Sequence, residues 1–153
     1  MARASLWLAA LWWGSLTTLG FGVVPLLFVH LPTPAMAGGM AARLFSAQTW
    51  VSAVCGLLLL MLMVRLDRTA SVAHSVEKNC ENTTVALVPY EKYATIFVVG
   101  GILLAFLAEF AIAPRIVARE NLKLWHAVGS AMYLLQWVCA GTALWKLTDR
   151  RQV

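Results

Sequence analysis

The stretch LFSAQTWVSAVCGLLLLMLMV, residues 44–64, contains no charged side chain. A helix needs about 20 predominantly apolar residues to cross the hydrocarbon core of a bilayer. Within that core every backbone N–H and C=O group must find a partner inside the protein, and a helix supplies those partners from its own segment. Residues 44–64 are therefore predicted to form a transmembrane helix.

One further apolar stretch precedes this one, at about residues 5–31, and two follow it, at about residues 93–113 and 124–145. Each is long enough to span a bilayer, and residues 93–113 hold a single charge, Glu109. The sequence thus predicts an all-α integral membrane protein. It would form a single domain over residues 1–153, built as a bundle of four transmembrane helices.

The composition agrees with a lipid-facing surface. Hydrophobic residues make up 61% of the chain and charged residues 12%, whereas a soluble domain carries about 25% charged residues. The expected surrounding is therefore the lipid bilayer. The formal net charge is +5, but the basic residues flank the apolar stretches and form no continuous patch. Nucleic acid is therefore not expected as a partner.

The connections between the four stretches differ in length. Residues 32–42 and 114–123 are short, whereas residues 65–92 form a long polar stretch of balanced charge. Short connections join antiparallel neighbours, so the first two and the last two helices are expected to pair as two hairpins. The long stretch is expected to be a solvated cytoplasmic connector. No sequence repeat between the two halves is evident.

The distribution of Lys and Arg predicts the orientation, because cytoplasmic loops carry an excess of both. Eight lie on the side of the N-terminus and four on the opposite side. Both termini and the long connector are therefore expected in the cytoplasm. The eight are Arg3, Arg65, Arg68, Lys78, Lys92, Lys146, Arg150 and Arg151, and the four are Arg43, Arg115, Arg119 and Lys123.

Small residues fall on one face of each predicted helix. Lipid tails are as apolar as leucine, so transmembrane helices associate through small residues and polar contacts. These faces are interpreted as packing faces within one bundle or between copies of it. The predicted packing positions are Gly14, Thr18, Gly22, Pro25, Gly101, Ala105, Gly129 and Ser130.

Glu109 is the strongest candidate for a functional residue. An ionisable group inside a span costs about 2.5–3.5 kcal/mol on insertion scales, so it suggests function and should have a partner. One interpretation is a carboxylate paired with an arginine at the same end of the bundle. The other is a proton-handling or ligand-binding cluster. The candidate members of this polar cluster are Glu109, His126, Arg115, His30 and Arg43.

Cofactor chemistry receives little support from the sequence. A haem held by His30 and His126 is conceivable in a four-helix bundle, but neither shares a helical face with a second histidine. No cofactor is therefore expected, with haem as the alternative. Met61 and Met63 could attract a soft metal ion, although no metal site is predicted. The commonest catalytic motifs are missing, and no catalytic residue is predicted.

A family resemblance covers most of the chain outside the long connector. The order of tryptophan, glycine, proline and leucine–phenylalanine positions along the chain is similar to that of a bacterial family of unknown function. This family is related to eukaryotic transmembrane proteins associated with platinum-drug tolerance. The resemblance implies four helices, a bacterial inner membrane and no settled reaction. The architecture is also similar to copper-resistance D and HemJ-type proteins, although the early histidine expected of the HemJ type is missing. The matching positions are Trp12 or Trp13, Gly14, Pro25, Leu27, Phe28, Leu31, Pro32, Ala37, Gly38, Leu44, Phe45, residues 113–116, Trp125, His126 and Ser130.

Three functions remain open from the sequence. The first is a non-catalytic accessory or oligomerising subunit of the inner membrane, alone or in a larger membrane complex. The second is a small-molecule, metal or proton-coupled carrier that uses Glu109 and His126. The third is a haem or porphyrin redox protein with His126 and His30 as ligands.

Overall fold

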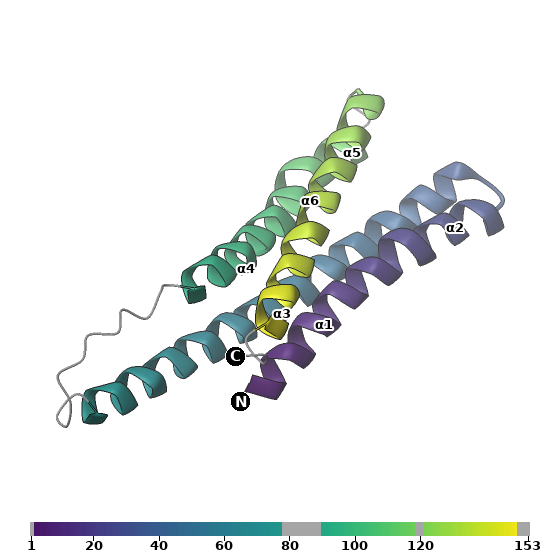
Figure 1. The fold of residues 1–153 in the computed structure, drawn as a ribbon. Coiled ribbons are helices and arrows are strands. Elements are labelled where there is room, and N and C mark those ends of the chain that lie inside the picture. Colours follow the sequence, from purple (N-terminus) through teal and green to yellow (C-terminus); the bar gives the residue numbers. More distant parts are fainter. Residues whose placement is uncertain (1, 78–89, 119–120, 150–153) are drawn as a thin grey trace.

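The computed structural model describes residues 2–77, 90–118 and 121–149, and every regular element in these ranges is helical (Figure 1). The predicted all-α class is confirmed for them. Four helices are long and apolar enough to cross a membrane, which is the pattern of a multi-pass membrane protein. The elements are α1 (Ala2–Thr17), η1 (Thr18–Val23), α2 (Val24–His30), α3 (Pro34–Glu77), α4 (Tyr90–Leu107), η2 (Ala108–Ile112), α5 (Ala113–Val117) and α6 (Leu122–Asp149).

Helix α3 is longer at both ends than the sequence predicted. It begins at Pro34, a residue assigned to the first connection, because Pro is tolerated in the first turn of a helix and Thr33 Oγ1 accepts the Met36 N–H at 3.3 Å. It also runs through residues 65–77, expected as connector, where the sequence has neither Pro nor Gly. Its 44 residues span about 66 Å, more than twice the hydrocarbon thickness of about 30 Å.

Two of the spans are interrupted by short π-helical segments, each followed by a proline. In the first span η1 leads into α2 with Pro25 in its first turn, and in the third η2 leads into α5 with Pro114 in its first turn. Proline cannot donate the hydrogen bond that an α-helix requires, and its ring crowds the preceding turn. The wider π turn lies directly before each proline, and the chain continues as one span.

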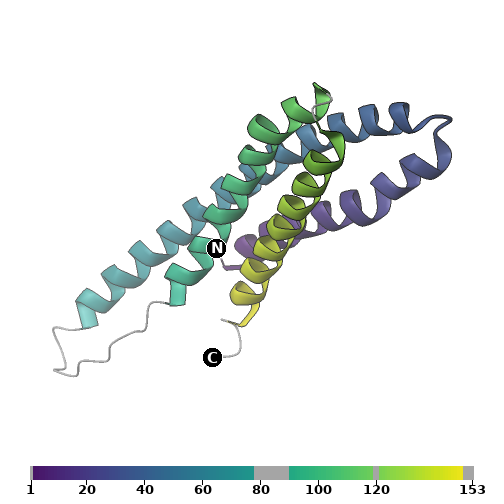
Figure 2. The same ribbon diagram turned by 90° about the horizontal axis from the view of Figure 1, so that it is seen from above.

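The helices form a ring in which each packs mainly against two neighbours. Helix α1 packs against α3 and α6, and α4 packs against the same two. The hairpins α1–α3 and α4–α6 therefore sit with α1 and α4 at opposite corners. Helix α1 begins and α6 ends at the same end of the bundle, while the two hairpin tips diverge at the other end, as both views show (Figures 1 and 2).

The two hairpins repeat one sequence and burial pattern. Residues 21–25 read FGVVP and residues 110–114 read FAIAP, 89 positions further along, and each stretch spans the end of a π segment and the proline after it. Burial repeats at the same spacing, which places the two spans in equivalent environments. The buried pairs are Ser5 and Ala94, Ala9 and Val98, Trp12 and Gly101, and Leu16 and Ala105.

The second helix of each hairpin repeats as well. Phe45 precedes Gln48 by three residues in α3, and Tyr133 precedes Gln136 by three residues in α6, 88 positions further along. The buried pairs at this spacing are Gln48 and Gln136, Ser52 and Ala140, Cys55 and Ala143, and Leu59 and Leu147. This repeat is not evident in the sequence because few of the equivalent residues are identical.

Equivalent residues of the two halves meet near the centre of the bundle. The indole of Trp12 packs on Gly101, and the rings of Phe45 and Tyr133 lie 5.1 Å apart between centroids. Contacts between equivalent positions occur where a two-fold axis passes. The bundle is therefore a pseudo-two-fold arrangement of two hairpins that start at the same end.

Candidate functional site

Hydrogen bonds between side chains connect the helices inside the bundle. Gln136 Nε2 on α6 donates to Ser52 Oγ on α3 at 2.9 Å, and both residues are buried. Its equivalent Gln48 on α3 donates to Ser15 Oγ on α1, also at 2.9 Å. The two glutamines thus link three of the four spans. In an apolar surrounding such contacts hold helices together, because an unpaired amide there is unfavourable.

The hydroxyl of Tyr133 is inserted into the backbone of the first span. It donates to the Leu16 carbonyl at 2.8 Å, and the Gly20 backbone N–H donates to the same hydroxyl. In a regular α-helix this carbonyl and this N–H would bond to each other. A side chain inserted into the hydrogen-bond ladder is a known cause of a helix irregularity, which accounts for the start of η1 here.

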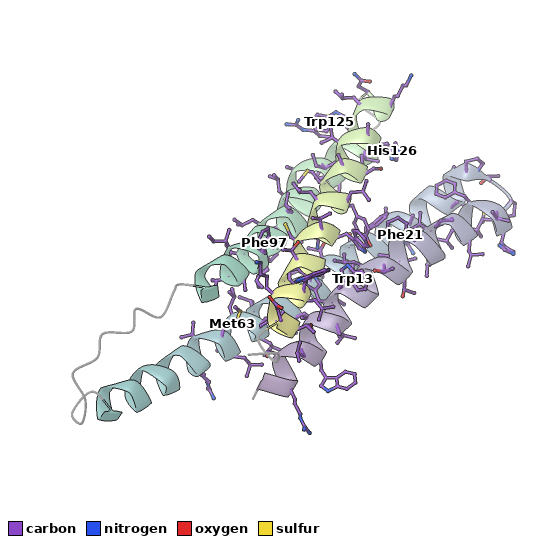
Figure 3. All side chains as sticks on the ribbon, viewed as in Figure 1. Trp13, Phe21, Met63, Phe97, Trp125 and His126 are labelled. Carbon is purple, nitrogen blue, oxygen red and sulfur yellow. The ribbon has the colours of Figure 1, made fainter. Side chains whose placement is uncertain are left out.

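Tryptophans fill the space beside this contact. Trp137 Nε1 donates to Thr17 Oγ1 at 2.8 Å, and the Trp137 ring lies 5.5 Å from that of Trp13 (Figure 3 labels Trp13). The indole N–H groups of Trp12 and Trp13 are buried without a partner in the described part of the chain. These two rings therefore contribute shape and apolar contact, and their polar atoms add no hydrogen bond.

Glu109 lies within η2, inside the third span, and is partly buried. Its Oε1 accepts a hydrogen bond from Ser46 Oγ of α3 at 2.7 Å. Among the residues that the structure describes, it makes no ion pair with a lysine, arginine or histidine. Its observed partner is therefore Ser46, a residue that was not among the predicted ones. Arg115 and Arg43 do not pair with it, and Arg119, the third arginine predicted at this end, lies outside the described residues.

Arg115 has a different partner from the one expected. Its guanidinium carbon lies 4.4 Å from the centroid of the Trp125 ring, a cation–π contact between α5 and α6. Arg43 is exposed on α3. Both arginines thus lie at the hairpin tips without meeting Glu109.

The two candidate histidines lie on separate hairpins. His30 ends α2, is exposed, and its Nδ1 lies 3.0 Å from the Leu26 carbonyl of its own helix. His126 is exposed on α6, on the opposite side of that helix from Trp125 (Figure 3). Because the hairpin tips diverge, the structure does not bring the predicted polar cluster together. Groups of three or more His, Cys, Asp or Glu that could hold a metal are also missing from the described residues.

The predicted packing positions divide into two classes. Gly101 lies under Trp12, Ala105 is buried, and Gly129 is in ordinary contact with Ile112. These three pack within the chain, whereas Ser130 is exposed. Glycines that the sequence analysis passed over also lie under large side chains: Gly20 under Tyr133, Gly56 under Ile102 and Gly141 under Trp13.

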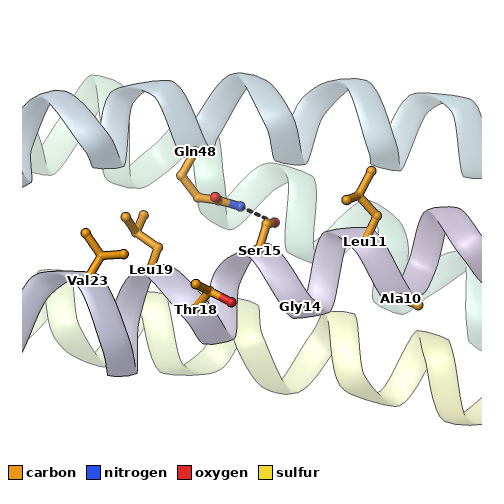
Figure 4. Close-up of a pocket in the computed structure, with 8 residues that line it drawn as sticks. All are labelled: Ala10, Leu11, Gly14, Ser15, Thr18, Leu19, Val23 and Gln48. Carbon is orange, nitrogen blue, oxygen red and sulfur yellow. Dashed lines mark hydrogen bonds between the residues drawn. The ribbon is translucent and has the colours of Figure 1, made fainter.

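The predicted face of the first span points away from the bundle. Gly14 and Gly22 have nothing within 4 Å of the place where a Cβ would stand, and Thr18 and Pro25 are exposed. Part of this face lines an open groove of about 530 Å³ between α1 and α3. Figure 4 shows the Gln48–Ser15 hydrogen bond at its floor. The lining residues are Ala10, Leu11, Gly14, Ser15, Thr18, Leu19, Val23 and Gln48.

Comparison with known proteins gives one match. The model of the family described as domain of unknown function (DUF4149) matches residues 7–124, which cover most of the first span and all of the second and third. No curated protein and no solved structure matches.

Proposed function

This chain belongs to the family described as domain of unknown function (DUF4149), a description that names no activity. We therefore propose its function from the geometry: it is a membrane subunit that assembles with a second copy of itself through the outer face of the first span, formed by α1 and η1. This face consists of Ala10, Gly14, Thr18 and Gly22, which recur at every fourth residue. Small residues at this spacing allow two helix backbones to approach closely in a membrane.

The comparison between the two halves is the observation that carries this proposal. The four equivalent positions in the second half, 89 residues further along, hold Val99, Leu103, Leu107 and Ala111. Three of them are large, and the two leucines are 62% and 54% exposed. Large apolar side chains thus face outward where lipid is the expected neighbour. On the first span the same outward face holds small residues and an open groove. Such a surface is shaped to accommodate a neighbouring helix and not lipid chains.

A second copy is the occupant that we propose because the stripe is self-complementary. Two helices that each offer a flat stripe of small residues can approach along the same patch, as a two-fold contact requires. The Thr18 hydroxyl, exposed on this face, would gain a polar neighbour from the other copy. A leucine in place of Gly14 would separate the two backbones.

The test is the dimer fraction of fluorescently labelled protein in lipid vesicles, counted by single-molecule photobleaching. Gly14→Leu and Gly22→Leu should each weaken the dimer by about 1–3 kcal/mol, the usual range for overpacking. Neither should lower the melting temperature of the monomer, measured at high dilution in detergent, because the space beside both glycines is open. Gly100→Leu is the matched control, since Gly100 also has open space but lies on α4. A monomeric wild type, or a dimer that Gly14→Leu leaves intact, would contradict the proposal.

The proposed location is the bacterial inner membrane with both termini in the cytoplasm. The excess of Lys and Arg on the side of the termini supports this orientation. Among the alternative functions, haem binding would require His30 and His126 to meet, but they lie on diverging hairpin tips. A role in metal or drug tolerance is supported only by the family resemblance. The carrier function is supported by one observation, the Glu109 carboxylate inside a span.

A further inference from the structure

Glu109 sits where the backbone leaves hydrogen-bond acceptors without donors. The Ala113 N–H donates to the Ala108 carbonyl, and the next residue, Pro114, has no N–H. The Glu109 carbonyl therefore lacks both donors that an α or a π turn could offer it. A free carbonyl and a carboxylate thus belong to one residue inside a span.

The first half of the chain has the same free carbonyl but no acid on that residue. There Gly20, 89 residues earlier, holds the position of Glu109, and the Val24 N–H donates to the Leu19 carbonyl while Pro25 has no N–H. The Tyr133 hydroxyl bonds one turn earlier, to the Leu16 carbonyl and the Gly20 N–H. The residue equivalent to Tyr133 in the other hairpin is Phe45, which has no hydroxyl. The second half therefore lacks the inserted group and carries an acid instead.

The Glu109 carboxylate has more acceptor capacity than the described residues satisfy. An ionised carboxylate offers about four lone-pair sites, and the structure gives it one donor, the Ser46 hydroxyl at 2.7 Å. None of the cationic side chains whose positions the structure describes lies at ion-pair distance, and Arg119 lies outside the described residues. Hydrocarbon supplies no donors, so the remaining acceptors require water or a cation.

We propose that Glu109 and Ser46 form a binding site for one sodium ion. Carboxylate, hydroxyl and carbonyl oxygens are hard ligands that suit this class of ion, whereas soft metals prefer sulfur and nitrogen. A single carboxylate matches a single positive charge, and Ca²⁺ would demand 6–8 oxygens. Interrupted membrane helices whose unpaired carbonyls coordinate Na⁺ are a recurring arrangement. The inference deepens the carrier alternative and does not depend on the α1 dimer.

The experiment measures binding of ²²Na⁺ to the full chain in nanodiscs, by scintillation proximity, together with melting in NaCl against choline chloride at equal ionic strength. We expect saturable binding of one ion and a higher melting temperature in NaCl. Glu109→Gln should abolish both effects, and Ser46→Ala should weaken the affinity by about tenfold, as the loss of a hydrogen bond to a charged group does.

Ser52→Ala is the matched control, because Ser52 lies on α3 like Ser46 and its buried hydroxyl bonds to Gln136 of α6. This variant should leave the sodium affinity unchanged. If Glu109→Gln does not fold, Glu109→Asp replaces it, with weakened binding expected. Wild type without saturable ²²Na⁺ binding, or Glu109→Gln that still binds, would overturn the proposal. A melting temperature that changes with pH but does not respond to sodium would also overturn the proposal, because the ion bound at Glu109 would then be a proton.

Discussion

Trp12 and Gly101 face each other across the bundle, with Trp12 Cη2 at 2.7 Å from the place where a Cβ on Gly101 would stand. The two residues hold equivalent positions in the two hairpins, and both are buried. One half thus provides the large side chain and the other provides the space for it. The close approach of α1 to the opposite corner of the bundle depends on this difference.

Gly101→Ala should destabilise the bundle. The new methyl would stand 2.7 Å and 2.9 Å from two atoms of a fully buried indole ring, so the ring or a helix must shift, at a cost of about 1–3 kcal/mol. Thermal melting in mild detergent, followed by tryptophan fluorescence, measures the change. Gly100→Ala, next in the chain and with open space, should stay within about 0.5 kcal/mol, and equal losses in both variants would refute the packing argument.

Tyr133→Phe should also lower stability, through the backbone of the first span. It removes the hydroxyl between the Leu16 carbonyl and the Gly20 N–H and leaves both groups without that partner, at a cost of about 1–3 kcal/mol. The ring itself stays, so the variant separates hydrogen bonding from packing. Melting temperature is the measurement, and no change would mean that η1 forms without the inserted hydroxyl.

The Gln136–Ser52 pair allows a double-mutant cycle. Ser52→Ala leaves a buried amide without its acceptor and should cost about 1–3 kcal/mol, whereas Ser52→Ala combined with Gln136→Leu should recover much of the loss, because two apolar partners leave nothing unpaired. Chemical or thermal unfolding of the four proteins gives the coupling energy. Simple additivity of the two single changes would contradict a direct interaction.

The proposed orientation can be checked with fusions at the C-terminus. A green fluorescent protein fused there should fluoresce, and an alkaline phosphatase fused there should be inactive, because both report the cytoplasmic side. A cysteine introduced at Thr33, in the connection between α2 and α3, should react with a membrane-impermeant maleimide added to intact cells. Active phosphatase together with an unlabelled Thr33→Cys variant would reverse the assignment.

The polar site could be predicted only in part. Glu109 stands out in the sequence because charges are rare inside spans, but its partner Ser46 does not, since serine is common in membrane helices. Arg115, one of the arginines predicted near Glu109, lies on Trp125, because α5 and α6 hold that pair close together. The pairing of donors and acceptors depends on the distances between helices. These distances cannot be read from the sequence.

The sequence by itself determined the number and class of the helices, because the length of an apolar stretch and the need to satisfy its backbone leave one solution in a membrane. It did not determine where the helices end: the structure continues α3 through residues assigned to connections. Only the tertiary structure decided which glycines pack. Gly14 and Gly22 have open space, whereas Gly20 and Gly101 lie under large rings. The physical reason is that a small residue allows close approach on any face of its helix. Whether a large side chain packs against that residue depends on how the helices are arranged around the bundle.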